Sequence, residues 1–592
     1  MADASFKTVL VKDSILADIT PDLAYAVQSG GAQKTYQAFP STSASNSAII
    51  FNVRLPSESV VMGRDILLST GLTFRVKCGA VPVGETAFEY GVTDSLQAFP
   101  LNSLFTTATC QVNNTTVSIN MQDVLPSLLR MNDSRELYRY NSMTPALPDQ
   151  AWGSYKDAVG SNSNPMASYN NPSYDLDQVS RGSHPVVLNV VHNISGGGTD
   201  NSLVSTNVAD TWVITIQTVI CEPVFLSPFI WGNPEFNAQG ILGVNNLTFT
   251  LNVDAQCKRL MSTGKYSIVD NKKVPYITSI TLGATDGANG FTTNAPIGAY
   301  LAQTAPTLHL KFLSTQPTDL IETRNVVPFM DMPRFLSSAA NNGAPIPPPV
   351  EGAYTTRTLT SSNIQLNQIP DLIVINVRKP MAEQNASDVT GFLTVNGLSI
   401  NFNNQSGLLS SASAWDLWRL SSKNGSTQSW AEFSGQQTVN GRNGIEPTTA
   451  FASTTGSLII LNPSYDLSLP AYLACGSLGQ YNVQFQIQVT NQFEEEITPE
   501  IIIICVNSGI MSTNMGTTST YTGILTKDMV MSAKESRDPM SSAEHHRMVG
   551  GSMLNRLLTS HIHRKRLSKA PMKEVGMPEP LKMAKHRLKS MM

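Results

Sequence analysis

Short runs of β-branched and aromatic residues, separated by turn residues, recur along most of the chain. One set of runs predicts strands at Ser47–Leu55, Leu72–Cys78, Ala108–Val117, Thr211–Cys221, Leu247–Val253 and Tyr276–Leu282. A second set predicts strands at Thr307–Phe312, Asp371–Val377, Leu393–Phe402, Ser457–Leu461, Tyr481–Val489 and Glu500–Val506. In the run YNVQFQIQV, apolar and polar residues alternate as in a half-buried antiparallel strand. Such strands without long helices between them favour a sandwich or jelly roll over a parallel α/β sheet.

Two strand sets of similar size predict two domains, with a linker near Ala302–Pro306. A faint internal repeat supports this division. Val112–Met131 runs from a turn through a strand to a short amphipathic helix, and Thr394–Leu420 repeats that order. The two segments also share the tripeptide Ser-Ile-Asn, at Ser118–Asn120 and at Ser399–Asn401. The matching order of elements supports the division into two domains, and duplication of one β unit is one explanation of it.

Two long polar stretches interrupt the strands. Asn132–Thr206 is rich in Asn, Ser, Pro and Tyr, and Leu336–Thr358 contains the run APIPPPV. Loops of this length usually carry function, so we expect both to project from a rigid β scaffold. From Thr526 onward, Met and His become frequent, which indicates a separate, partly helical tail. We thus expect an N-terminal arm (1–40), a first β domain (41–305) with a long insertion (132–206), a second β domain (306–525) and a tail (526–592).

Charge divides the chain in the same way. Only 14% of the 592 residues are charged, against about 25% in a typical soluble domain, and Asn, Gln, Ser and Thr fill the gap. The whole chain has 40 basic and 44 acidic residues, but residues 556–592 hold ten basic and two acidic ones, a net charge of +8. The remainder is therefore at −12. A basic tail on an acidic body is typical of an arm that meets nucleic acid, an acidic protein surface or anionic lipid.

The tail begins with a candidate helix. Ser552–Leu567 follows Gly550 and Gly551 and spaces its apolar residues as a helix does. Its basic side chains and those that follow are Arg556, Arg564, Lys565, Arg566, Lys569 and Lys573. A basic amphipathic helix suits a membrane surface, a partner groove or a polyanion, and the alternative is a terminal helix that docks on its own domain. Nothing here reads base sequence, so any contact with nucleic acid would neutralise phosphates and depend on salt.

The cysteines predict neither a zinc site nor a disulfide framework. All six are scattered without a CxxC pair, which indicates buried free thiols in a reducing compartment: Cys78, Cys110, Cys221, Cys257, Cys475 and Cys505. The N-terminus lacks the basic start and apolar stretch of a signal peptide. The run Ile501–Val506 is far shorter than the roughly 18 residues that span a bilayer. We therefore expect no export, and interpret the glycosylation sequons at Asn193 and Asn246 as chance.

The search for an active site finds none. The sequence has no nucleophile elbow, no phosphate-binding Gly loop ending in Lys-Ser or Lys-Thr, and no HExxH. Outside the tail, His184, His192 and His309 are too far apart to assign as ligands, and we interpret them as structural or surface residues. Glu494–Glu496 fit a solvated turn. The sequence thus predicts no catalytic, cofactor or metal site, and argues against an enzyme.

Several segments resemble a known family. Ser361–Pro380, Leu398–Ser421, Leu461–Gln492 and Ser519–Val530 resemble the double jelly-roll major capsid proteins of polinton-like viruses and related dsDNA viruses, of virophage or adintovirus type. Phe99–Leu129 matches less distinctly. The resemblance implies an all-β chain of two tandem eight-stranded antiparallel jelly rolls with short helices. It further implies three chains in a pseudo-hexameric capsomer, an icosahedral shell around a dsDNA genome, and penton and minor capsid proteins as partners.

The resemblance also implies a maturation step. Related viruses encode an adenovirus-type cysteine protease, which cleaves after Gly-Gly preceded two residues earlier by Met, Ile or Leu. Met548, Val549, Gly550 and Gly551, followed by Ser552, fit that pattern, and cleavage there would release the +8 tail. The segment 194–198, ISGGG, fits it too, but it lies inside the predicted first jelly roll, so the tail site is favoured. The alternative for Gly550 and Gly551 is a flexible hinge before a helix.

Two other classes of protein remain open at this stage. One is a capsid protein of an RNA virus with a single jelly roll and a projecting domain, in which the two halves would differ in topology. The other is an exported β-rich adhesin or carbohydrate-binding protein, which would present an aromatic groove from among Trp152, Trp231, Trp415, Trp418 and Trp430. The absence of an export signal argues against it. Trp415 and Trp418 share one helix face, which favours a core position for both.

Overall fold

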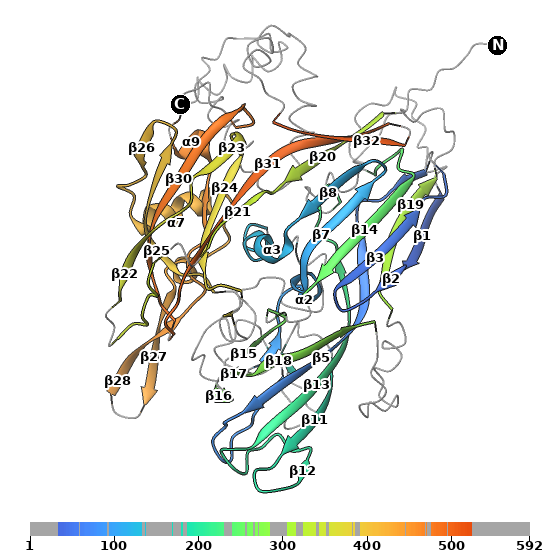
Figure 1. Ribbon diagram of the computed structural model, residues 1–592. Coiled ribbons are helices and arrows are strands. Elements are labelled where there is room, and N and C mark those ends of the chain that lie inside the picture. The colour runs from blue at the N-terminus through green and yellow to red at the C-terminus, as the bar shows by residue number, and fades with distance from the viewer. Residues whose placement is uncertain are drawn as a thin grey trace, which may run out of the picture.

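The computed structural model describes residues 33–523 (Figure 1), except for 58–59, 91–93, 133–136, 138–167, 170–178, 181–185, 230–239, 255–256, 258, 264–266, 270–271, 284–304, 315–323, 339–342, 351–353, 382, 385–390, 444–445, 468, 470–474, 494 and 515. Two β units make up the described part. Helix α3 lies between them (Figure 1). The expected tail, 526–592, lies outside the described residues.

The first unit is a jelly roll of two antiparallel sheets. One sheet joins β1 (Gln33–Pro40), β19 (Thr307–Ser314), β5 (Leu67–Gly79), β13 (Thr211–Pro223), β11 (Val187–Asn193) and β12 (Thr199–Asp200), with β4 (Val60–Met62) and β18 (Tyr276–Leu282) paired alongside. The other joins β2 (Ser43–Ala44), β3 (Ala48–Arg54), β14 (Asn246–Val253), β7 (Phe105–Val112) and β8 (Thr115–Ile119). Numbered along the chain, the eight principal strands are β1, β3, β5, β7, β8, β13, β14 and β19. They pair in the orders 1-8-3-6 and 2-7-4-5, the jelly-roll arrangement.

The second unit repeats this strand order. Its first sheet contains β20 (Arg324–Asp331), β21 (Arg334–Ser337), β31 (Glu500–Asn514), β24 (Leu372–Arg378), β29 (Ile459–Leu461) and β32 (Thr517–Thr522). Its second contains β22 (Thr356–Thr360), β23 (Ile364–Gln368), β30 (Leu478–Thr490), β25 (Thr394–Phe402) and β26 (Gln405–Leu408). With β21 as the first strand and β22 and β23 together as the second, the orders are again 1-8-3-6 and 2-7-4-5. The predicted fold class, two tandem eight-stranded jelly rolls, is confirmed.

The remaining elements are short. Helices α2 (Pro100–Ser103), α3 (Met121–Leu129), α7 (Ala414–Lys423), α8 (Trp430–Phe433) and α9 (Pro463–Asp466) connect strands. Four strand pairs complete the described residues: β6 (Asp94–Leu96) with β15 (Met261–Thr263), β9 (Ser168–Tyr169) with β10 (Val179–Ser180), β16 (Ser267–Val269) with β17 (Lys272–Val274), and β27 (Gln436–Asn443) with β28 (Glu446–Ser453).

Several sequence-based limits differ from the observed strands. Residues 33–40, expected in an arm, form β1. The run at Thr307, expected to open the second unit, forms β19. Both strands lie in the first sheet, because β1 pairs with β19 and β19 pairs with β5. We therefore propose that the first jelly roll spans 33–314 and the second 324–523. The stretch 132–206, expected as a loop, contains β11, because its β-branched residues pair with β13. The other expected loop is anchored where Ile346, fully buried, bridges to Ile497.

The internal repeat is present in the structure, but in another register. Ala108–Val117, expected as one strand, is the hairpin β7–β8, which turns at Asn113 with φ of 53°. Asn403 turns the hairpin β25–β26 with φ of 49°. Each Asn donates its backbone N–H to the strand that pairs beside it, at Asn246 or at Asn482, and accepts from that strand's backbone through Oδ1. Asparagine tolerates this left-handed conformation, so the turns at Asn113 and Asn403 are structurally equivalent. The two Ser-Ile-Asn tripeptides are not equivalent, because Ser118–Asn120 lies at the end of β8 and Ser399–Asn401 lies within β25.

Two hydrophobic cores hold the fold. The first fills the first jelly roll and continues into residues of the second, among them Val327, Leu372, Val374, Phe392, Ile502 and Ile504. The second fills the interior of the second jelly roll and takes the apolar side of β30, as the alternation in that run predicts. Strand β24 is buried on both faces, one in each core. The two jelly rolls therefore contact each other across the outer face of this sheet.

Candidate assembly surfaces

The predicted tail residues and the predicted cleavage pattern are not among the described residues. This applies to Met548, Gly550, Gly551 and Ser552, and to Arg556, Arg564, Lys565, Arg566, Lys569 and Lys573. The second copy of the pattern is described: Gly196, Gly197 and Gly198 all have positive φ in the turn between β11 and β12. That turn is closed by hydrogen bonds from Ile194 N to Gly198 O and from Gly197 N to Ile194 O. A closed turn presents no extended strand to a protease.

The two described histidines have the structural roles expected. His192 is fully buried; its ring stacks on Trp212 with the centroids 4.6 Å apart. Its Nδ1 lies 2.7 Å from Asp200 Oδ1 and its Nε2 lies 3.1 Å from Asp210 Oδ2. Asp210 accepts hydrogen bonds from Ser195, Thr206 and Asn207, which hold the pKa of its carboxyl well below its usual value although burial acts to raise it. His309 Nε2 lies 2.7 Å from Ser69 Oγ. His184 lies outside the described residues.

Other classes of site find no support in the described part of the chain. Its residues hold no group of three or more His, Cys, Asp or Glu side chains placed to bind a metal ion. Every helix that the structure describes is too short or too polar to cross a bilayer.

Helix α3 makes the contact between the two jelly rolls. Asn120 caps it by accepting from Asp123 N, and all its residues but Gln122 are buried. Asp123 Oδ1 lies 2.5 Å from Arg378 Nη2, and Asp123 Oδ2 lies 2.7 Å from Arg334 Nε. Arg378 Nε lies 2.7 Å from Glu500 Oε1. Burial raises the pKa of Glu500, and Arg378 opposes that shift. The four side chains form one ion network across the boundary, in which Asp123, Arg378 and Glu500 are buried and Arg334 is partly exposed.

Further contacts of α3 extend this interface. Asn376 Nδ2 donates to Ser127 Oγ at 2.9 Å. Arg130, fully buried at the end of α3, donates from Nη1 to Pro126 O and lies over the ring of Phe392 at 4.8 Å. Its carbonyl accepts from Thr427 N and Oγ1, in the loop that follows α7. The outer face of the second jelly roll is thereby covered by a helix of the first.

Helix α7 has the corresponding position in the second jelly roll, but it is exposed. Ser413 caps it and exchanges hydrogen bonds with Asp416, and the bonds from Ser413 hold the pKa of Asp416 below its usual value. Only Leu417 and Ser421 are buried. Trp415, expected in the core, is 52% exposed and stacks on Trp430 with a centroid separation of 3.6 Å. The expectation was wrong because Trp415 packs on the neighbouring helix α8, at the surface, and not inward.

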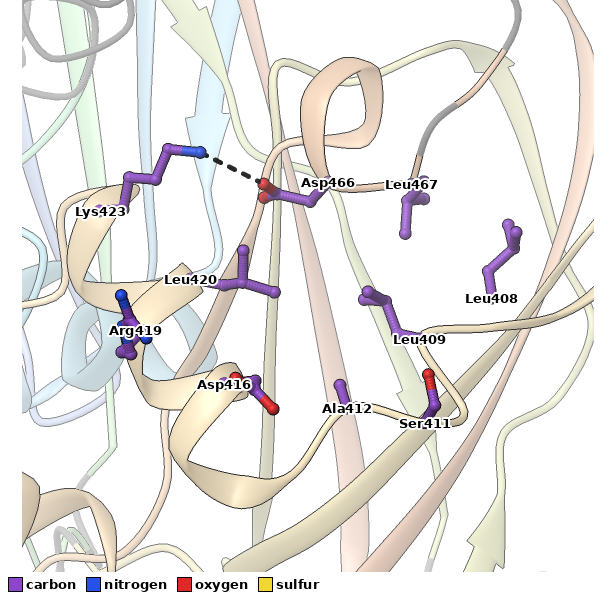
Figure 2. Close-up of a pocket in the computed structure, with 10 residues that line it drawn as sticks. All are labelled: Leu408, Leu409, Ser411, Ala412, Asp416, Arg419, Leu420, Lys423, Asp466 and Leu467. Carbon is purple, nitrogen blue, oxygen red and sulfur yellow. Dashed lines mark ion pairs between the residues drawn. The ribbon is translucent and has the colours of Figure 1, made fainter.

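Trp418 and the pocket beside α7 complete this surface, which we call the α7 surface. Trp418, half-buried, meets both Trp415 and Trp430 edge-on and donates from Nε1 to Gln428 O. An open pocket of about 690 Å³ lies between α7, the turn after β26 and the end of α9. Figure 2 shows the residues that line it. Its lining is Leu408, Leu409, Ser411, Ala412, Asp416, Arg419, Leu420, Lys423, Asp466 and Leu467. Lys423 Nζ lies 4.0 Å from Asp466 Oδ1 (Figure 2).

A second exposed surface lies on the first jelly roll, on the outer face of β1, β19, β5 and β13; we call it the β1–β19 face. The register places Tyr36 opposite Lys311 on this face, whereas Leu310 and Phe312 point into the core. Tyr36 is 75% exposed.

Cys221 is exposed on the same face, paired with Ser69. This corrects the expectation of six buried thiols: Cys78, Cys110, Cys257 and Cys505 are buried, and Cys475 is half-buried.

Comparison with known proteins identifies relatives over both jelly rolls. Residues 4–286 match the family model of the first domain of the Sputnik virophage major capsid protein, and residues 332–509 match that of the major capsid protein V20 C-terminal domain. Capsid protein V20 of the Sputnik virophage is 27% identical over 549 residues, which are 91% of this chain and 83% of that protein.

Two solved structures share the fold. The chain in the cryo-EM structure of the Sputnik virophage aligns with a TM-score of 0.68 and 24% identity, over 90% of this chain and 96% of that chain. The crystal structure of the mavirus major capsid protein aligns with a TM-score of 0.64 and 16% identity, over 91% and 99%. The two family models, the V20 protein and the mavirus chain are all named as capsid proteins.

Proposed function

This chain belongs to the virophage type of double jelly-roll major capsid proteins, and from that premise we propose that three copies assemble into a pseudo-hexameric capsomer. The observation that supports the proposal is the repeated strand order of the two jelly rolls. Three chains supply six units of one topology, which fit a near-hexagonal tile when they form a closed ring. Such tiles cover the faces of an icosahedral shell.

The composition suits a surface made for burial. Only 14% of the residues are charged. Asn and Gln side chains can hydrogen-bond across an interface without the desolvation cost that charges carry. Contacts between subunits, between capsomers, and with penton and minor capsid proteins would therefore bury the sides of the jelly rolls. We propose that this shell encloses a dsDNA genome, with the basic tail directed to nucleic acid or to an internal anionic membrane.

Two earlier alternatives lose their support. A capsid protein with one jelly roll and a projecting domain requires halves of different topology, and here both halves have the same strand order. An adhesin would present an aromatic groove; of the tryptophans considered, Trp415, Trp418 and Trp430 do form a cluster, but the relatives over both halves are capsid proteins. The capsid function accounts for the whole described chain.

The mass of the purified protein tests the capsomer. Light scattering is expected to give about 192 kDa, three times the 64.0 kDa of one chain, and negative-stain images of the same sample should show hexagonal outlines. A strict monomer at high concentration, unchanged by added minor capsid protein, would contradict the proposal. Closed shells would support it further.

We also propose that the cognate protease removes the tail after Gly551. Both matched capsid domains end before residue 510, so cleavage there leaves them intact. Incubation with the protease should shorten the chain by residues 552–592 and reduce its binding to DNA or anionic vesicles at low salt. The variant Gly551→Val should stay full-length, while Gly197→Val, in the second copy of the pattern, should not prevent the cut. A chain of unchanged mass after incubation would refute cleavage.

A further inference from the structure

Helices α3 and α7 are equivalent in the fold but differ in what covers them. Each follows the fifth strand of its jelly roll, β8 or β26. Each has a polar cap followed three residues later by an aspartate: Asn120 with Asp123, and Ser413 with Asp416. Helix α3 is buried against the second jelly roll, whereas α7 buries only Leu417 and Ser421. Within one chain, α3 is therefore covered by a jelly-roll sheet, and no described sheet covers α7 in the same way.

The packing of α3 indicates which surface could cover α7 in the same way. Helix α3 packs on the outer face of the 1-8-3-6 sheet of the second jelly roll, and its Asp123 engages Arg378 on β24 and Arg334 on β21. In the first jelly roll, the outer face of the 1-8-3-6 sheet is the β1–β19 face. That face carries the exposed ring of Tyr36 and, opposite it on β19, the half-buried side chain of Lys311, which interacts electrostatically with Asp65. An aromatic group and a cation are the complements of Trp415 and Asp416.

We propose that the α7 surface of one chain docks on the β1–β19 face of a second copy, repeating between chains the contact that α3 makes within the chain. This inference rests on the proposed trimer. The contact joins two different surfaces, so it is head-to-tail and closes into a ring when it alternates with the internal one. Each chain contributes one α7 surface and one β1–β19 face, and a ring of three leaves neither unused.

The chemistry of the two surfaces agrees with this pairing. Trp415 and its stacked partner Trp430 offer a flat aromatic surface, the kind of side chain that dominates binding when it is buried at an interface centre. Tyr36 is the most exposed large hydrophobic side chain on the described surface. Asp416, kept ionised by its cap, would meet Lys311. The pocket beside α7 leaves room for side chains of the partner (Figure 2).

Introducing a negative charge on each surface tests the docking. Trp415→Glu and Tyr36→Glu should each reduce the mass from three chains to one, because each ring needs every junction. An equimolar mixture of the two variants retains one intact junction per pair and should give a mass of two chains. The control Val83→Glu introduces the same charge at a 62% exposed site outside both surfaces and should remain a trimer. Circular dichroism should show that all three variants are folded.

Photo-cross-linking identifies directly the surface that α7 contacts in the second chain. With benzoylphenylalanine in place of Arg419, an exposed residue of α7, irradiation should link two chains through peptides that contain Gln33–Pro40 or Thr307–Ser314. Links only to other segments, or a trimer that survives Trp415→Glu, would overturn the inference while the capsomer itself stands. A wild-type chain that never trimerises would remove the proposed function instead.

Discussion

Replacing Arg378 by methionine is expected to lower the free energy of unfolding by about 3–5 kcal/mol, the usual cost of removing one partner from a buried ion network. Arg378 is 5% exposed and contacts both Asp123 and Glu500. Methionine fills much of the same volume but removes the guanidinium that contacts Glu500 and leaves Asp123 paired with Arg334 alone. The urea midpoint at one fixed protein concentration measures the effect, because assembly also contributes to stability.

The same variant should be less impaired in acid. Without Arg378, burial raises the folded-state pKa of Glu500 further above its unfolded value. A carboxyl group with a raised pKa destabilises the fold once it ionises, so the deficit of the variant should be small below the unfolded pKa of about 4.3 and grow as pH rises through the folded pKa. Arg54→Met, at an exposed position of β3, is the matched control and should change little. An equal deficit from pH 4 to pH 8 would contradict the buried-network explanation.

Trp212→Ala is expected to cost a similar amount, about 3–5 kcal/mol, through the cavity that it leaves. Trp212 lies on β13 with no exposed surface, stacks on His192 and donates from Nε1 to Ser202 O at 2.9 Å. Its loss would also free the segment that Asp210 organises between β11 and β13. Urea unfolding followed by circular dichroism measures the change.

Trp415→Ala provides the comparison, because the same atoms are removed from a side chain that is 52% exposed. It should cost far less stability than Trp212→Ala and yet weaken the trimer. If both substitutions lowered the urea midpoint equally in the monomeric state, α7 would contribute to the core of its own jelly roll, and its surface would not be available for a partner.

Local patterns in the sequence predict the strands well. The alternation in Tyr481–Val489 gives the buried face of β30 correctly, since each side chain's burial follows from the pleat alone. The Asn-Asn pair at Asn113 also indicates a turn in the sequence, because Asn tolerates a left-handed conformation. There the apolar residues on both sides suggested one continuous strand, and turn chemistry prevailed over them.

Contacts between distant segments could not be predicted in this way. Strand β1 pairs with β19, more than 260 residues away, and no local signal in residues 33–40 reveals that partner. Asp123 and Arg378 are separated by 255 residues, and each appears in isolation as an ordinary surface charge. The exposure of Trp415 depends on α8, which offers a second aromatic ring at the surface. Helix periodicity alone assigns such a residue to the core.

The core that continues from one jelly roll into the other couples the folding of the two units. Because Leu372, Val374, Ile502 and Ile504 are buried only when both units are in place, the chain should fold as one cooperative unit. The α7 surface belongs to one unit and the β1–β19 face to the other. A half-folded chain would therefore lack at least one surface of the proposed junction. Under the proposed ring of three, shared burial thus restricts assembly to chains in which both jelly rolls are folded.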